Sequence, residues 1–146
     1  MQHARRMSFV FTFGLVCLSL ASTSRADDPA YVAELTKVVV ENSRANQEKD
    51  LDAAMATIHP NSPSYAPTKQ MSKQLFAALD LNYEVTSFKY IGADDTYAVA
   101  RVSMQTKKKN DGRDFQDNET QLMIVFRKDG DKWKVWSQSI LERKNL

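Results

Sequence analysis

The stretch FRKDGDKWKV, residues 126–135, decides the fold class of this chain. Its centre, Asp129-Gly130, is a strong hairpin signal, because glycine accepts the positive φ that tight two-residue turns require. Apolar residues alternate with polar ones on both sides of it, at Leu122, Ile124, Phe126, Trp133 and Val135. A period of two is typical of half-buried strands. We therefore predict two antiparallel strands, Asp117 to Lys128 and Lys132 to Glu142.

Two more strands are predicted before this hairpin. The first runs from Tyr83 to Ile91 and is closed by the turn at residues 92–95. The second runs from Thr96 to Lys107, where small and apolar residues again alternate with polar ones. The turn signal Asn110-Asp111-Gly112 separates it from the third strand. Together the four strands form an antiparallel meander.

Before Asp80 the apolar residues follow a helical period instead. We predict a first helix from an N-cap at Asp28-Pro29 to about Arg44, and a short second helix capped by Asp50 and ended by His59-Pro60. Residues 61–67 are expected to form a loop, and a third helix is predicted from about Thr68 to Leu79. Helices followed by a meander indicate an α+β domain, with three N-terminal helices packed on one face of a four-stranded antiparallel sheet.

The chain resembles the NTF2-like (SnoaL-like) superfamily from about Tyr31 to Leu141. The resemblance is carried by the long first helix, the short second helix ending at Ile58-His59-Pro60, the loop tyrosine Tyr65 and the closing stretch 126–135. It implies a curved sheet wrapped into a cone, helices closing the cone around an apolar pocket, and dimerisation through the outer face of the sheet. Cystatin-like domains also combine helices with a meander and remain an alternative.

The first 26 residues have the pattern of a cleavable signal peptide. Arg5 and Arg6 precede an apolar run, and small residues flank Arg25 just before Asp27. The run is shorter than the ~20 residues that a membrane-spanning helix needs. We therefore expect residues 27–146 to form one exported domain, periplasmic or secreted, without a stable membrane anchor. The arginine pair is also compatible with a twin-arginine signal, and Cys17 with a lipidation site.

Loss of this leader changes the charge of the protein. Without its three arginines the formal net charge falls from +2 to −1, which gives no electrostatic reason to bind nucleic acid. The single cysteine, Cys17, leaves as well, and His59 remains as the last histidine. We expect no disulfide, no metal site and no cofactor.

Four side chains are predicted to contact a ligand inside the cone: Tyr65, Arg101, Gln121 and Gln138. The strand centres contain no carboxylate, so we assign no catalytic residue. Asp80, Glu84 and His59 are the acid or base candidates that remain. An inward Arg101 would favour an anionic ligand, whereas an outward one would suit a dimer face.

We therefore predict a homodimeric binding domain, which takes a small apolar or amphipathic ligand or a partner protein and is not catalytic. Members of the superfamily differ widely in activity, so the fold alone does not assign the chemistry. Two alternatives stay open. One is an isomerase or lyase that uses a pocket acid or histidine, and the other is a purely structural dimerising module.

Overall fold

The computed structural model describes residues 29–110 and 115–146. The predicted signal peptide, Asp28 and the centre of the turn at 111–112 lie outside these residues. The described helices are α1 Tyr31–Glu48, α2 Leu51–Ala56 and α3 Tyr65–Ala78. The described strands are β1 Leu81–Ala93, β2 Tyr97–Lys108, β3 Asn118–Asp129 and β4 Lys132–Asn145. The predicted α+β class and order of elements are confirmed.

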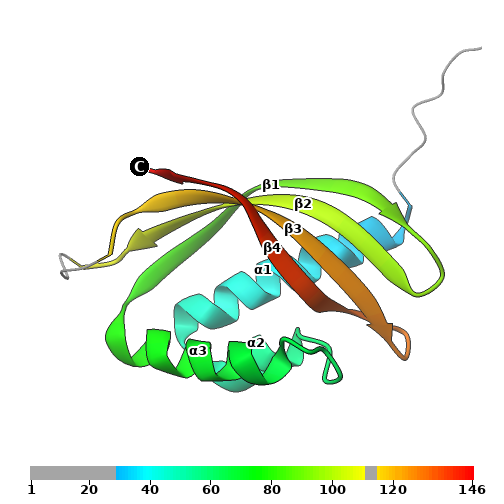
Figure 1. The fold of residues 1–146 in the computed structure, drawn as a ribbon, viewed down its shortest axis with the longest axis horizontal. Helices are drawn as coiled ribbons and strands as arrows, with labels where there is room; N and C mark the ends of the chain where they lie inside the picture. The colour runs from blue at the N-terminus through cyan, green and yellow to red at the C-terminus, as the bar shows by residue number, and fades with distance from the viewer. Residues whose placement is uncertain (1–28, 111–114) are drawn as a thin grey trace, which may run out of the picture.

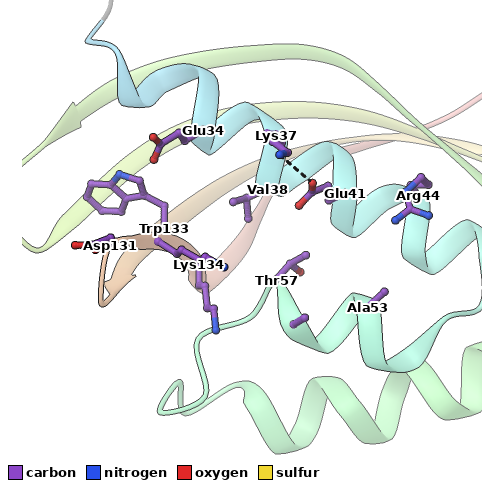
Figure 2. A pocket seen from close by; sticks show the side chains of 12 residues that line it. Glu34, Lys37, Val38, Glu41, Arg44, Ala53, Thr57, Asp131, Trp133 and Lys134 are labelled. Atoms are coloured by element: carbon purple, nitrogen blue, oxygen red, sulfur yellow. Dashed lines mark ion pairs between the residues drawn. The ribbon is translucent and has the colours of Figure 1, made fainter.

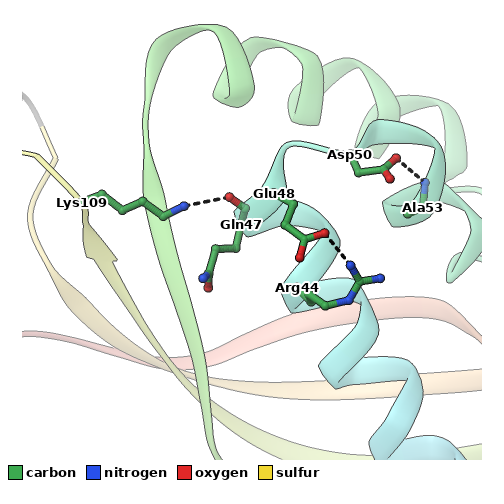
Figure 3. Close-up of polar contacts among 6 residues, drawn as sticks. All are labelled: Arg44, Gln47, Glu48, Asp50, Ala53 and Lys109. Atoms are coloured by element: carbon green, nitrogen blue, oxygen red, sulfur yellow. Dashed lines mark hydrogen bonds and ion pairs between the residues drawn. The ribbon is translucent and has the colours of Figure 1, made fainter.

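Helix α1 is about one turn longer than predicted. It continues past Arg44 to Glu48 and ends at Lys49, which takes a left-handed conformation at φ 59°. Asp50 then caps α2 as predicted, because its carboxylate accepts a hydrogen bond of 2.9 Å from the Ala53 amide. Figure 3 shows this junction, where the Lys109 ammonium also donates to the Gln47 carbonyl at 2.9 Å.

Helix α3 begins three residues earlier than predicted, at Tyr65. We expected Pro67 to keep this stretch in a loop. Proline is tolerated in the first turn of a helix, where its missing N–H would have no partner, so Pro67 does not prevent the helix from starting. As a result Tyr65 lies at the beginning of α3 rather than in a loop.

The four strands form one antiparallel sheet in the order β1-β2-β3-β4. The register shifts twice between β1 and β2 and twice between β3 and β4. Such bulges bend a strand and increase its twist, which accounts for the curvature of the sheet. Figure 1 shows the sheet arched above α1, with α2 and α3 further below it.

The core lies between α1 and the concave face of the sheet. Helix α1 contributes Leu35 and Val39, and the sheet contributes Ala98, Ala100, Val102, Leu122, Ile124, Phe126, Trp133 and Val135. Trp133 is 5% exposed, which confirms its predicted place in the core. Trp136 lies on the opposite face, where the Arg127 guanidinium sits 4.5 Å from its ring centre.

A short segment after α2 joins the helices to the edge of the sheet. Ile58 forms a parallel bridge with Val135, in which the His59 amide donates to the Val135 carbonyl at 2.8 Å. The Val135 amide donates in turn to the Thr57 carbonyl at 2.9 Å. Among the helices of the described ranges, none has the length and apolar character that crossing a membrane requires.

Candidate functional site

Two hollows formed by residues 29–110 and 115–146 are candidate sites. The first is a surface groove of about 760 Å³ between α1, α2 and the β3–β4 hairpin. Figure 2 shows α1 above the groove, Trp133 on the side of the β3–β4 hairpin and Thr57 at the end of α2. Its walls carry charged side chains of both signs, notably Glu34, Lys37 and Arg44.

The cations of this groove are largely engaged within the protein. Lys37 pairs with Glu41 one turn along α1 at 3.6 Å, and Lys134 pairs with Asp129 at 2.8 Å. Arg44 pairs with Glu48 in the same manner. The two i,i+4 pairs of α1 are ordinary on a solvated helix surface and contribute little. Glu34, Asp131 and Lys132 also line the groove without an ion pair to the described residues, and they carry both signs, so the groove does not single out one kind of ligand.

The second hollow is an inner cavity of about 180 Å³ between the three helices and the concave face of the sheet. Its apolar lining consists of Ala54, Met55, Ile58, Met71, Leu75, Met104, Leu122 and Val135. Its polar lining consists of Asn42, Ser43, Asn46, Thr68, Ser72, Tyr83 and Gln138. An apolar hollow with a few converging polar groups is the usual form of a small-molecule site.

Three of these polar side chains, all on α1, make hydrogen bonds within the helices. The Asn42 amide donates to the Thr57 hydroxyl at 2.7 Å, which links α1 to the end of α2. Ser43 donates to a carbonyl one turn earlier in α1. The Asn46 amide nitrogen donates to the Asn42 carbonyl at 2.8 Å and to its side-chain oxygen at 3.1 Å. Only the Asn46 side-chain oxygen is left without a donor from the described residues.

The other four polar groups are not engaged by side-chain hydrogen bonds within residues 29–110 and 115–146. They are the hydroxyls of Thr68, Ser72 and Tyr83 and the amide of Gln138. Ser72 is only 6% exposed, although it lies on a helix that buries no other side chain. Burial raises the pKa of the Tyr83 phenol, so this group stays protonated and neutral.

The predicted ligand contacts are placed differently from one another. Gln138 lines the inner cavity, and Tyr65, Arg101 and Gln121 do not. Tyr65 is half-buried at the first position of α3. Arg101 is exposed and Gln121 half-buried, because each precedes an inward-facing residue and so lies on the outer face of its strand. An outward Arg101 gives no reason to expect an anionic ligand in the cone.

The acid and base candidates also lie outside the cavity lining. Asp80 pairs with Lys49 at 2.6 Å, and Glu84 is exposed on β1. His59 is 4% exposed, its Nδ1 accepts a hydrogen bond of 3.1 Å from the Asn61 amide, and its ring packs edge-on to Trp136. This histidine follows the end of α2, in the short segment that bonds to Val135 of β4. It does not line the cavity.

Sequence reasoning missed the hydroxyls of Thr68, Ser72 and Tyr83. A signal for the first two was present, since Thr68 and Ser72 are four residues apart, as are Met71 and Leu75, and both pairs belong to one side of a helix. Tyr83 had no comparable signal. Within the part of the chain that the structure describes, no three His, Cys, Asp or Glu side chains gather in a way that could hold a metal ion.

Most of the sequence matches a known protein family. Residues 37–146 match the family described as "Anti-sigma-I factor RsgI9, C-terminal domain". No curated protein matches the sequence.

Several solved structures share the fold at low sequence identity. A ketosteroid isomerase-like protein from Erwinia carotovora atroseptica is 16% identical with a TM-score of 0.56, over 77% of this chain and 98% of that one. An NTF-2 like protein of unknown function from Shewanella oneidensis is 14% identical with a TM-score of 0.58, over 74% and 96%. A protein of unknown function with a cystatin-like fold from Nostoc punctiforme is 11% identical with a TM-score of 0.62, over 74% and 87%.

Proposed function

The chain belongs to the family of the anti-sigma-I factor RsgI9 C-terminal domain and has the NTF2-like fold, and from this premise we propose that it is a non-catalytic binding domain. Its ligand is a small amphipathic molecule held in the inner cavity. The proposal includes export, which is supported by the leader pattern of residues 1–26.

The observation that carries this proposal is the chemistry of the cavity lining. Its described residues include amides, hydroxyls and apolar side chains, but no carboxylate, histidine, cysteine or lysine. A general acid or base must lie within hydrogen-bond reach of the proton that it transfers. Asp80, Glu84 and His59 are not among the residues that form this cavity. Binding therefore fits the site better than proton transfer.

The named relatives support the same reading without deciding it. The family takes its name from the C-terminal domain of an anti-sigma-I factor, a description that names no enzyme. One structural neighbour is described as ketosteroid isomerase-like, so the fold also occurs where an enzyme is named. Because proteins with one fold have many different functions, we base the proposed function on the residues that line the cavity and not on the fold.

Native mass spectrometry of the protein purified from its exporting host tests this proposal. We expect a chain that begins near Asp27 and carries one retained small molecule. Ser72→Phe should abolish retention, because its ring would occupy the cavity, whereas Gln74→Phe on the exposed side of α3 should not. Circular dichroism checks that both variants are folded.

Two results would contradict the proposal. The first is equal retention by a folded Ser72→Phe variant and its Gln74→Phe control, which would place the ligand elsewhere. The second is turnover of a bound compound that disappears when Asp80, Glu84 or His59 alone is replaced. That second result would favour the isomerase or lyase alternative.

A further inference from the structure

Resting on the proposed function, the geometry points to one ligand class for the inner cavity: an uncharged molecule of about one substituted six-membered ring, with at least one hydrogen-bond donor and one acceptor. Three properties of the cavity lead to this class. They are the absence of charge in its described lining, its free polar groups and its volume.

Charge is the first property. The described residues that line the cavity include no acidic or basic side chain. A charged ligand group would lose part of its hydration on entry and gain no opposite charge, which is costly against a largely apolar lining. An amide or hydroxyl would lose less hydration and would find hydrogen-bond partners. The lining therefore selects against carboxylates and ammonium groups.

The free hydroxyl of Ser72 is the second property. Helical serines commonly bond to the carbonyl one turn earlier, as Ser43 does to the Val39 carbonyl at 2.9 Å. Ser72 makes no such bond, although it is 6% exposed. No fully enclosed side-chain nitrogen or oxygen of the described residues lacks a partner. The Ser72 oxygen therefore borders the cavity, where a ligand group can satisfy it.

The ligand needs both a hydrogen-bond donor and a hydrogen-bond acceptor to pair with the groups of the cavity. The Asn46 amide nitrogen is engaged within α1, so this residue offers the cavity only its oxygen, which needs a donor. The phenol of Tyr83 stays protonated and offers a donor, which needs an acceptor. Thr68 and Ser72 serve either purpose. A purely apolar ligand would leave all of these groups unpaired.

Volume is the third property. The cavity of about 180 Å³ is close to the roughly 150 Å³ of an apolar cavity that accommodates benzene. The sheet provides an apolar surface for a ring through Met104, Leu122 and Val135. The polar groups of α1, α3 and β1 lie around this surface. A ring with one amide or hydroxyl substituent matches both the space and the chemistry.

Three probes with the same ring separate these properties: benzamide, benzoate and toluene. Each is titrated into the purified protein while backbone amide shifts of Ala54, Ser72 and Gln138 are followed by NMR. We expect benzamide to give saturable shifts, with a Kd at least about tenfold below that of benzoate or toluene.

Two substitutions test whether the preference for benzamide depends on the hydroxyls of Ser72 and Tyr83. Ser72→Ala and Tyr83→Phe should each raise the benzamide Kd about three- to tenfold, the effect of one lost hydrogen bond. The Kd of toluene should not change. Gln74→Ala, on the exposed side of α3, is the matched control and should leave all three probes unaffected.

The results that would overturn the ligand class differ from those that would overturn the proposed function. Tighter binding of toluene or benzoate at the same residues overturns the uncharged, hydrogen-bonding class and leaves the proposed binding function in place. Absence of shifts with all three probes overturns the ring-sized class, and the mass spectrometry above still decides the proposed function. Unchanged benzamide binding in both Ser72→Ala and Tyr83→Phe overturns the assignment of the polar contacts.

Discussion

At the scale of single residues, one ion pair fastens the end of α1 to the start of the sheet. Lys49 follows α1 and its ammonium lies 2.6 Å from the carboxylate of Asp80, which immediately precedes β1. The hydrogen bond from Lys49 and then its charge lower the pKa of Asp80. The pair is partly exposed, so solvent screens the attraction between its charges.

This pKa shift sets the direction of a pH dependence. A carboxyl group with a lowered pKa binds fewer protons in the folded than in the unfolded protein. Its contribution to stability is therefore complete above its unfolded pKa and is lost as the pH falls through its folded pKa. We expect the unfolding free energy of Asp80→Asn to fall less than that of the wild type between about pH 5 and pH 2, measured by urea denaturation.

Glu84→Gln is the control for this experiment. Glu84 is an exposed carboxylate on β1 with no ion pair to the described residues. Its replacement should leave the pH dependence close to that of the wild type. Parallel curves for Asp80→Asn and the wild type would show that the pair does not persist in solution.

At the scale of elements, the turn between β3 and β4 depends on one glycine. Gly130 has φ +61°, a conformation that costs other L-residues about 1–2 kcal/mol. Gly92 in β1 does not have a positive φ, and a Cβ at either glycine would meet no atom within 4 Å. The two positions therefore differ in backbone conformation and not in steric space.

We expect Gly130→Ala to lower the unfolding free energy by about 1–2 kcal/mol. Gly92→Ala should not lower it and should raise it by about 0.5–1 kcal/mol, since glycine within a strand is less favourable than alanine by about that amount. Thermal or urea unfolding of the two variants provides the comparison. Equal losses would mean that the Asp129-Gly130 turn does not constrain the hairpin.

At the scale of the whole molecule, the convex face of the sheet suits association with a second copy. Lys89 and Arg101 are paired across β1 and β2, and Met123 lies beside Arg101 on β3. Towards the other end of the strands lie Glu84 and Glu119, on either side of Gln105. A two-fold axis between these two positions would place Lys89 and Arg101 of one copy opposite Glu84 and Glu119 of the other, beside which Lys144 also lies on β4.

We propose that the protein is a homodimer through this face. Sedimentation of the wild type should give a dimer at micromolar concentration. Arg101→Glu should weaken the dimer at least tenfold by opposing like charges, and adding Glu119→Arg should restore part of the loss. Lys37→Glu on the outward side of α1 is the control. A monomeric wild type, or an unaffected Arg101→Glu variant, would contradict the proposal.

Much of the fold follows from the sequence alone. The helical period before Asp80 and the alternation after it gave the order and approximate bounds of every described element. Asp50 was identified as a cap and Trp133 as a core residue. These features depend on neighbours within a few positions along the chain, which is why local patterns predict them. The C-terminal end of α1 and the start of α3 were missed, because residues at helix ends tolerate more than one conformation.

The lining of the cavity was decided by tertiary structure. The register of β4 against β3 shifts beside Trp136, so Gln138 pairs with the inward-facing Ile124 and shares its face. Without that bulge the alternation from Trp133 and Val135 would turn Gln138 outward. Ser72 lines the same cavity as Tyr83 and Gln138 only because α3 lies across from the sheet. Alternation within one strand determines which residues share a face, but the position of a bulge and the packing of a distant helix depend on contacts between segments far apart in the chain.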